Sequence, residues 1–300
     1  MNDLEERYDR NIRLFGKDGQ DRLRRTDATA IGAGGLGSML IEQLAYLGLR
    51  RVFAVDPDML DESNRNRLAG AKGSDPIPGT FKVAIAARHV REINPEIEVI
   101  PLPVNLVSEA AFNAVRQAHF VFGCLDHDGP RFILNELCAA YSKPYIDLAS
   151  DVTGPTTYGG RVYVNMDGTG CLQCHDVLDL HDVRRYLQSE REQAAIEAIY
   201  GIDRRVLGDT GPAVAPINGI VASMAALEFM VAVTGMREPT RHINLRGHQS
   251  KVLVSTDNPV GDCPVCKGIR GLGAEADCER YLRIPHLNRN TKPVKELCDA

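Results

Sequence analysis

A glycine-rich loop at residues 32–37, Gly-Ala-Gly-Gly-Leu-Gly, is the first feature that could do chemistry. It directly follows the apolar segment 27–31 and precedes apolar residues at helical spacing. A Gly-x-Gly-x-x-Gly turn between a strand and a helix binds phosphate, because the glycines let the backbone approach the anion and the helix N-terminus attracts it. A turn that serves only the strand–helix junction is the alternative. We predict a nucleotide site at Gly32, Gly34, Gly35, Leu36 and Gly37.

Charged residues after this loop indicate which nucleotide would bind. Asp56 ends the next apolar segment, where a carboxylate can accept hydrogen bonds from the ribose of either NAD or ATP. Arg67 and Lys82 add cations, and Asp126 follows a further apolar segment. An enzyme that cleaves ATP between its α- and β-phosphates needs cations over the phosphates and a carboxylate for Mg²⁺, whereas a dehydrogenase has no use for cations aimed at a γ-phosphate. The set therefore favours ATP with Mg²⁺, and the alternative for each residue is a surface charge.

Two Cys-x-x-Cys pairs, Cys171 with Cys174 and Cys263 with Cys266, lie far apart in the chain. Each pair places two thiolates on one side of a tight turn, and four thiolates make a closed tetrahedral Zn²⁺ site. A pair of redox dithiols is the alternative, but neither pair begins a helix after a strand as in thioredoxin-like proteins. We predict a structural zinc that joins two distant parts of one domain.

The composition excludes several classes of protein. The chain has 300 residues, of which 44% are hydrophobic and 25% charged, so it can bury a sizeable core. Its formal net charge of -5 implies no basic surface, so we do not expect nucleic acid as a partner. The apolar runs fall short of a membrane span and the charged N-terminus is unlike a signal peptide, so we expect a cytoplasmic protein without membrane contact. In that compartment the eight cysteines indicate metal binding or catalysis before disulfides.

Alternating strands and helices must position these residues. Short apolar runs predict strands, and apolar residues at helical spacing between them predict helices. We therefore predict an α/β fold of the Rossmann-like, doubly wound kind, with a mainly parallel sheet, helices on both faces and a zinc-tied C-terminal part. The expected strands are 27–31, 51–56, 98–102, 119–124, 144–148 and 160–164, with a strand pair at 242–255; the expected helices, besides the one after the glycines, are 82–93, 108–117, 129–141, 181–200 and 217–234.

In combination these motifs resemble the ThiF/MoeB/HesA family, the bacterial relatives of ubiquitin-activating enzymes. The resemblance covers about residues 5–268 and implies one adenylation domain over 1–270, with an N-terminal helical arm at 1–25, a crossover loop at about 175–210 and a tail at 271–300. The residues that carry it are Arg7-Tyr8-Asp9-Arg10, Leu14-Phe15-Gly16, the glycine loop, Asp56 and Asp58, Ser63-Asn64, Arg67, Lys82, Asp126, both cysteine pairs, and the segment 210–219 before an apolar helix.

The resemblance implies ATP-dependent adenylation of a C-terminal carboxylate, usually the terminal glycine of a ubiquitin-like or sulfur-carrier protein. Chemically, this reaction needs positioning and charge neutralisation and no general base. Arg10 would reach into the site of a partner subunit, so a homodimer is implied. The other roles that the resemblance assigns are nucleotide contacts for the glycine loop and Asp58, ribose binding for Asp56, phosphate contacts for Asn64, Arg67 and Lys82, and Mg²⁺ binding for Asp126.

Two departures from the family pattern bear on the mechanism. Leu68 follows the phosphate-binding arginine, where many family members have glutamine. Members that form a thioester carry a cysteine in the crossover loop, and this chain has none between His175 and Thr210. We therefore predict no thioester at that loop and direct transfer of the adenylate to a downstream thiol or amine. Cys278 or Cys298 could substitute only if the tail folded back.

Three other functions stay open from the sequence. One is activation of a short peptide C-terminus, as some family members do for peptide antibiotics. Another is a catalytically silent partner-binding protein, against which the complete set of Arg67, Lys82 and Asp126 argues. The third is an NAD-dependent dehydrogenase, disfavoured by the extra phosphate cations.

Overall fold

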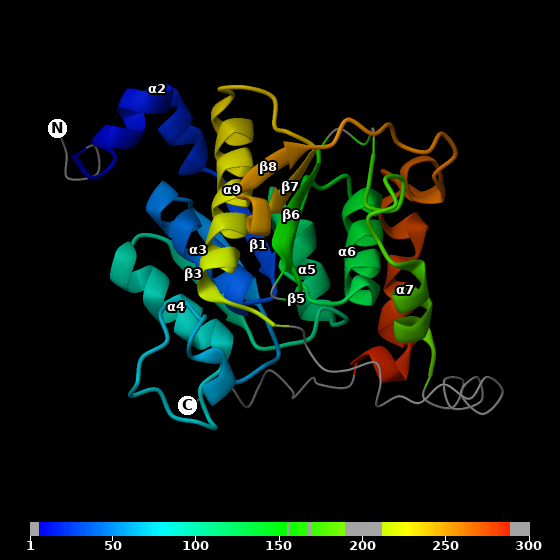
Figure 1. The fold of residues 1–300 in the computed structure, drawn as a ribbon, viewed down its shortest axis with the longest axis horizontal. Coiled ribbons are helices and arrows are strands. Elements are labelled where there is room, and N and C mark those ends of the chain that lie inside the picture. The colour runs from blue at the N-terminus through cyan, green and yellow to red at the C-terminus, as the bar shows by residue number, and fades with distance from the viewer. Residues whose placement is uncertain (1–5, 155, 167, 169, 190–211, 289–300) are drawn as a thin grey trace.

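The computed structural model describes residues 6–154, 156–166, 168, 170–189 and 212–288 (Figure 1). Within these residues, eight strands form one sheet in the order β3-β2-β1-β4-β5-β6-β7-β8. The five strands from β3 to β5 are parallel to their neighbours, and β6, β7 and β8 continue the sheet antiparallel. The prediction of a Rossmann-like, mainly parallel sheet is confirmed.

The elements follow the predicted alternation. The strands are β1 (Asp27–Ile31), β2 (Arg51–Val55), β3 (Glu98–Leu102), β4 (Phe120–Gly123), β5 (Tyr145–Gly154), β6 (Thr157–Asn165), β7 (His242–Arg246) and β8 (Lys251–Val254). The helices are α2 (Asp9–Leu23), α3 (Gly35–Leu47), α4 (Lys82–Ile93), α5 (Glu109–Gln117), α6 (Asp128–Ala140), α7 (Leu180–Leu187) and α9 (Ala215–Thr234), and short helical turns follow at Pro264–Ile269, Gly273–Ala276, Cys278–Arg283 and Pro285–Asn288.

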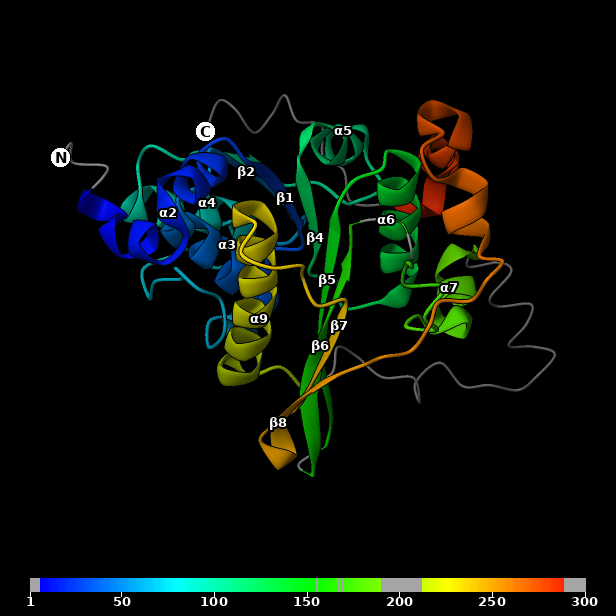
Figure 2. The same cartoon turned by 90° about the horizontal axis from the view of Figure 1, so that it is seen from above.

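Helices cover both faces of the sheet, which Figure 2 shows edge-on. One apolar core lies under α3, α4 and α9, and includes Leu40, Leu44 and Phe229. A second core lies on the other face under α5 and α6, and includes Phe112 and Leu137. Because both faces are buried, the parallel strands are apolar throughout, and all five residues of β1 are buried.

The strand order reverses between β1 and β4, which are direct neighbours although two strands separate them in the chain. Ligands of open α/β sheets bind in the crevice at the carboxyl ends of the strands at such a point. Ile31 at the end of β1 lies in register with Gly123 at the end of β4. The glycine loop and the segment leading to Asp126 therefore begin side by side.

The predicted helix over 181–200 was wrong in extent. Helix α7 ends at Leu187, and Gln188 has an extended backbone with φ -77° and ψ 143°. Val183, Tyr186 and Leu187 pack towards α6, and the polar residues Gln188 and Ser189 follow them. Residues 190–200 lie outside the described part of the chain.

Helix α9 bears on the expectation that the apolar runs are too short to span a membrane. Among the described residues it is the one helix long and apolar enough to cross a membrane by length and composition, with a mean hydropathy of 1.7. Half of that stretch is buried in the protein, against α3, β5 and β6, and a core helix passes the same test. Its buried Glu228 receives two hydrogen bonds from Arg237, at 2.7 and 2.8 Å.

Candidate active site

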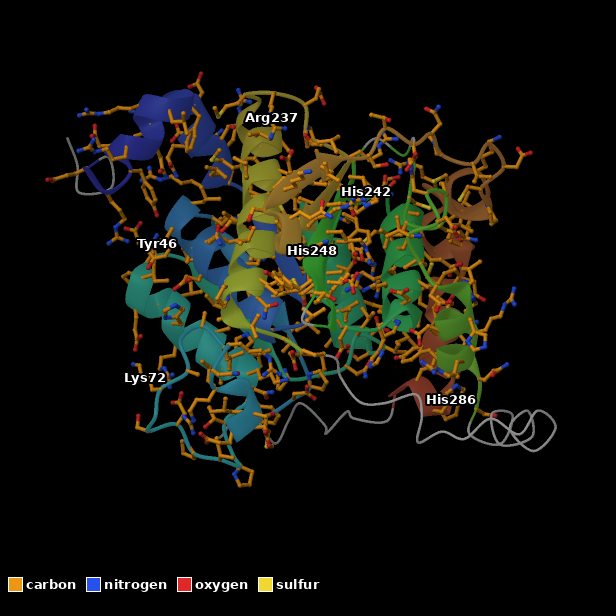
Figure 3. The ribbon with its side chains drawn as sticks, viewed as in Figure 1. Tyr46, Lys72, Arg237, His242, His248 and His286 are labelled. Atoms are coloured by element: carbon orange, nitrogen blue, oxygen red, sulfur yellow. The ribbon has the colours of Figure 1, made fainter. Side chains whose placement is uncertain are left out.

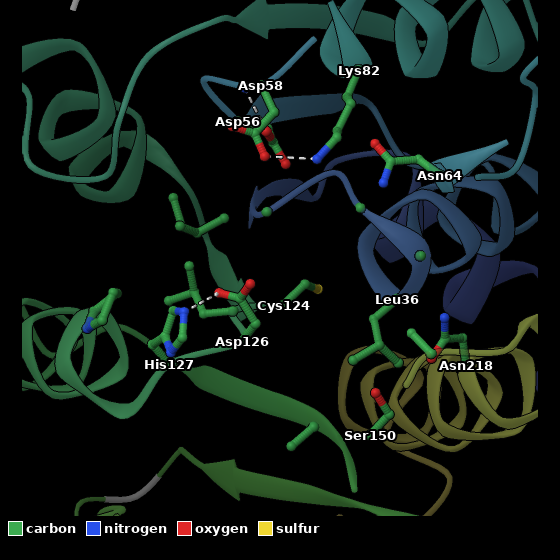
Figure 4. A pocket seen from close by; sticks show the side chains of 18 of the residues that line it. Leu36, Asp56, Asp58, Asn64, Lys82, Cys124, Asp126, His127, Ser150 and Asn218 are labelled. Atoms are coloured by element: carbon green, nitrogen blue, oxygen red, sulfur yellow. Dashed lines mark hydrogen bonds and ion pairs between the residues drawn. The ribbon is translucent and has the colours of Figure 1, made fainter. Parts of the chain in front are cut away.

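A cavity of about 870 Å³ opens at the carboxyl ends of β1, β2, β4 and β5. This volume is near the upper end of the range for small-molecule sites, so the cavity has room for a nucleotide and part of a second substrate. Figure 4 shows Asp56, Asp58 and Lys82 on one side, with Asp126 and Ser150 on the other. Of the predicted nucleotide-site residues, the cavity is lined by Gly32, Gly34, Gly35, Leu36, Asp56, Asp58, Asn64, Arg67, Lys82 and Asp126.

The glycine loop has the close approaches that its sequence indicates. A Cβ on Gly32, which has φ +96°, would lie 2.4 Å from the carbonyl oxygen of Cys124, and one on Gly37 would lie 1.9 Å from the Gly32 oxygen. Gly37 packs inside the loop and is absent from the cavity lining. Gly34 has nothing within 4 Å of its Cβ position and precedes α3, which no side chain caps. The N-terminus of α3 therefore presents free N–H groups to the cavity, which favours an anion.

Asp56 is fixed by backbone donors. Its Oδ2 accepts from the Ala33 N–H at 2.7 Å and its Oδ1 from the Asp58 N–H at 2.8 Å. Burial raises the pKa of the Asp56 carboxyl, and the positive charge of Lys82 opposes this effect. The carboxylate is therefore held rigidly between the loop and the segment after β2, as ribose binding would require.

Lys82 begins α4 and points back across the cavity. Its Nζ lies 2.7 Å from Asp58 Oδ2, and its backbone N–H donates to the Asp58 carbonyl at 3.0 Å. A bridge between Met59 and Phe81 holds the two segments together. The ammonium is thus held at the rim, where it can move from Asp58 to a phosphate.

Arg67 lies over the glycine loop, because its Cγ and Cδ atoms are 3.3 Å from the Cβ position of Gly35. Its guanidinium donates to the Ser63 carbonyl and, at 3.2 Å, to Asn66 Oδ1. Asn64 ends the preceding helical turn and its Oδ1 accepts from the Asp61 N–H at 3.3 Å. Leu68, which departs from the family pattern, is buried against Leu60 and Ile85, so it serves the packing beneath the site.

Asp126 follows β4 and is open to the cavity, with 69% of its side chain exposed. Its nearest ionic neighbour among the described residues is His127, at 4.0 Å (Figure 4). Among the described residues no arginine or lysine forms an ion pair with it, although the charge of Arg131 acts on it from a greater distance, so the carboxylate oxygens are available to a cation.

Two residues that sequence reasoning missed hold this geometry. Buried Arg131 donates to Asp147 Oδ2 at 2.9 Å, to the Leu148 carbonyl at 3.0 Å and to the Leu125 carbonyl, and so fixes the backbone next to Asp126. Asn218 in α9 is 1% exposed, its Nδ2 lies 2.3 Å from the Cβ position of Gly35, and its Oδ1 has no partner among the described residues. The sequence signal that could have indicated Asn218 is its position near the start of the apolar helix, directly after residues 212–217.

The structure keeps Arg10 away from the cavity of its own chain. Arg10 is exposed on α2, at the amino end of the sheet. There Gln20 donates to the Leu47 carbonyl at 2.9 Å and Arg22 to the Thr234 carbonyl at 3.1 Å, so α2 lies where α3 and α9 finish (Figure 1). The candidate site lies at the opposite end of these helices.

The four cysteines of the two predicted pairs meet at one point. Their Sγ atoms all lie within 4.8 Å of one another. The distances are 3.5 Å between Cys171 and Cys174, 3.7 Å between Cys171 and Cys263, and 3.3 Å between Cys174 and Cys266. Sulfur atoms at roughly 3.8 Å follow from a tetrahedral metal with bonds of about 2.3 Å. The cluster can therefore hold a metal ion, and it joins the segment after β6 to the segment after β8.

Comparison with known proteins decides the family. The sequence profile described as ThiF family matches residues 8–264, which is most of the chain. The chain belongs to the ThiF family. The resemblance inferred from the motifs is thereby confirmed, as is the prediction of an enzyme of the adenylyltransferase type, since several named relatives are adenylyltransferases.

Curated ThiF-family relatives differ in how much of their length this chain spans. Vegetative protein HesA of Trichormus variabilis is 28% identical over 267 residues, covering 87% of this chain and 89% of the relative. The sulfur carrier protein adenylyltransferase of Thermus thermophilus is 32% identical over 143 residues, covering 47% of this chain and 52% of the relative. The adenylyltransferase and sulfurtransferase UBA4 of Candida albicans is 27% identical, and this chain spans about half of it (47%).

Solved structures share the fold. E. coli MccB with ATP superposes with a TM-score of 0.66 at 20% identity, covering 87% of this chain and 74% of MccB. MccB in complex with N-formylated MccA gives a TM-score of 0.68 at 22% identity over the same shares. At this level of identity the likeness establishes the ThiF architecture and leaves the substrate open.

The tail of this ThiF-family chain is folded where it is described. Residues 273–288 form short helical turns on α5 and α6, where Tyr281 donates to Glu136 Oε2 at 2.6 Å and Glu279 pairs with Arg116 at 2.8 Å. Cys278 is fully buried there, and burial raises the pKa of its thiol to about 11. A buried, protonated thiol is a poor nucleophile. Cys298 lies outside the described residues.

This burial yields a prediction for Cys278→Ser. We expect adenylation to change by less than about twofold, while stability falls by about 1 kcal/mol because a hydroxyl replaces a buried thiol. The measurement is a non-reducing gel after incubation with ATP and a carrier protein, with Cys298→Ser as the parallel variant. A dithiothreitol-sensitive adduct that disappears in Cys278→Ser would contradict this expectation.

Proposed function

We propose that this protein adenylates the C-terminal carboxylate of a ubiquitin-like or sulfur-carrier protein with ATP. The observation that carries the proposal is the convergence of Arg67, Lys82 and Asp126 on one cavity around an open, uncapped glycine loop. Cations aimed at the phosphates and a free carboxylate for a metal are what cleavage between the α- and β-phosphates needs. The name of the Thermus thermophilus relative, a sulfur carrier protein adenylyltransferase, supports this substrate class.

In the proposed reaction, a carboxylate oxygen bonds to the α-phosphorus while the α–β phosphoanhydride breaks, and pyrophosphate leaves with the electron pair. Asp56 holds the ribose, and the α3 N-terminus stabilises charge at the α-phosphate. Arg67 and Lys82 neutralise the leaving pyrophosphate, and Asn64 contacts the phosphates beside them. Lys82 would first leave its ion pair with Asp58. The enzyme needs no nucleophile of its own, which agrees with the lack of a cysteine between residues 175 and 210.

The residues fit the two metals that the proposal includes. Asp126 is an exposed carboxylate with no Arg or Lys ion pair among the described residues; one such carboxylate together with substrate phosphates suits Mg²⁺, which would add charge neutralisation there. Four thiolates in a closed cluster fit a structural Zn²⁺. Thiols that stay unpaired in such a cluster also suit the reducing cytoplasm, the compartment that we propose.

Pyrophosphate exchange tests the proposed function. Purified sulfur-carrier and ubiquitin-like proteins with free C-terminal carboxylates should support exchange of labelled pyrophosphate into ATP, and the same proteins with a C-terminal amide should not. Exchange with short peptides alone would move the acceptor to a peptide. Exchange without any carboxylate, or cleavage of ATP to ADP, would contradict adenylation.

A homodimer completes the proposed site. Arg10 lies at the end of the molecule opposite to its own cavity, so the role in adenylation that we propose for it would be in the site of another subunit. Exposed apolar side chains on the adjacent helices α3 and α9, Tyr46, Ile220 and Leu227, offer a surface for that subunit. Figure 3 shows Tyr46 on the outer side of the molecule.

Mixed dimers test whether the site is shared. Arg10→Ala and Asp126→Ala homodimers should each lose exchange activity, while a heterodimer of the two should recover about one working site of two. Arg13→Ala, which removes an exposed charge one helical turn further along α2, is the matched control and should leave exchange unchanged. Confirmed heterodimers without recovered exchange would count against sharing.

A further inference from the structure

The cavity extends beyond the residues that the nucleotide would contact. Besides the phosphate-binding side, it is lined by Ala149, Ser150 and Val152 of β5, by Arg161 of β6 and by Tyr186 of α7. Figure 4 shows Ser150 across the cavity from Asp58 and Lys82. A separate part of the cavity, the acceptor side, is therefore formed by β5, β6 and α7.

Arg161 is the cation of the acceptor side that lacks a hydrogen-bonding partner. Its side chain is 23% exposed, and its Nε is buried with no partner among the described residues. The nearest carboxylate oxygens, of Asp128 and Asp147, lie 3.9 and 4.0 Å from its Nη2, which is beyond hydrogen-bond distance. Burial lowers the pKa of Arg161, and these carboxylates only partly oppose that effect.

These two acids are already engaged by other groups. Asp147 accepts from Arg131 at 2.9 Å and from the Tyr145 hydroxyl at 2.8 Å. Asp128 Oδ2 accepts from the Asp179 N–H at 2.7 Å, a bond that docks α7 on the start of α6. The buried Nε–H of Arg161 is thus left without an acceptor among the described residues, and its partly exposed Nη2 has carboxylates only beyond hydrogen-bond distance; a buried donor without a partner is costly until a ligand supplies an acceptor.

We propose that Arg161 binds a carboxylate of the acceptor substrate, and so orients the tail of that substrate towards the nucleotide. A planar guanidinium with free donors matches a carboxylate bidentately. The carboxylate is either the terminal group to be adenylated or an acidic side chain near it. The inference rests on the proposed adenylation, since it assigns one residue to the second substrate of that reaction.

The test uses two synthetic tetrapeptides with free carboxyl ends, Ala-Asp-Gly-Gly and Ala-Asn-Gly-Gly, with ATP, Mg²⁺ and hydroxylamine, which traps an acyl-adenylate as a hydroxamate. Arg161→Gln should raise the KM for the peptide about tenfold or more, because a charged hydrogen-bond pair is lost. Arg161→Lys should restore part of the loss. The KM for ATP and the melting temperature should stay close to wild type.

A matched control is Arg246→Gln. Arg246 is an exposed residue at the end of β7 and lies outside the cavity lining, so loss of its charge should change neither the peptide KM nor the ATP KM. Equal loss with both peptides would assign Arg161 to the terminal carboxylate, and loss with the Asp peptide alone would assign it to the side chain. Unchanged peptide KM values in Arg161→Gln would overturn the inference and leave adenylation standing. No hydroxamate and no AMP from wild type with either peptide would instead refute adenylation of such tails.

Discussion

Asp126→Asn is expected to lower the rate of carboxylate-dependent pyrophosphate exchange by about a thousandfold, since a metal-binding carboxylate supplies several kcal/mol of transition-state stabilisation. Asp126 is 69% exposed, and among the described residues its only ion pair is the 4.0 Å contact with His127, so the variant should fold and melt like wild type. The loss of exchange rate should therefore come from the chemical step and not from unfolding. Exchange kinetics at varied Mg²⁺, with melting curves, provide the measurement.

The matched control for this variant is Asp151→Asn. Asp151 is also an exposed carboxylate on the cavity lining, but it lies on β5, across from the phosphate side. We expect this variant to keep the Mg²⁺ dependence of wild type, because Asp151 would not touch the metal. Any change should fall on the KM for the carboxylate substrate, since Asp151 lies on the acceptor side of the cavity. Equal losses in both variants would show that general negative charge in the cavity matters, and would remove the specific role of Asp126.

Cys171→Ser is expected to release the metal and to lower the free energy of unfolding by about 4 kcal/mol, because the binding free energy of a structural zinc is largely folding free energy. The site joins segments that follow β6 and β8 and lies against Ala139 of α6. Metal analysis should give one Zn²⁺ per wild-type chain and none in the variant. Activity should fall in parallel with the folded fraction.

Cys138→Ala separates metal loss from the loss of a buried thiol. Cys138 is buried in α6 but lies outside the four-sulfur cluster. Its variant should keep the metal, and a strong chelator should lower its melting temperature as it does in wild type. The chelator should leave Cys171→Ser unchanged. A chelator effect of the same size in Cys171→Ser would show that the cysteines do not hold the stabilising metal.

Local signals made the nucleotide side of the site predictable. The glycine loop, Asp56 and Lys82 sit at ends of strands or the start of a helix, and a parallel sheet brings these ends together. The four cysteines were predictable because their spacing requires a shared partner. Residue spacing alone did not predict which glycines face open space: Gly34 has nothing within 4 Å of its Cβ position, whereas Gly37 packs closely against Gly32.

Contacts between distant elements were not predictable. Arg131 supports the Asp126 segment only because β5 brings Asp147 within 2.9 Å of it. Asn218 reaches Gly35 from a helix far along the chain. The polar composition of the tail also concealed its packing, because only Ala276, Cys278, Tyr281 and Leu287 of residues 273–287 are buried, too few to form a clear apolar pattern.

The account rests on attack by a substrate carboxylate on the α-phosphate of ATP, and an oxygen label tests that step most directly. A carrier protein that supports exchange is labelled with ¹⁸O in both oxygens of its C-terminal carboxylate and incubated with the enzyme, ATP, Mg²⁺ and hydroxylamine. When hydroxylamine takes the acyl group, the bridging oxygen leaves with AMP. We expect AMP that carries one ¹⁸O atom and pyrophosphate without label. Unlabelled AMP, or ADP with phosphate, would contradict it.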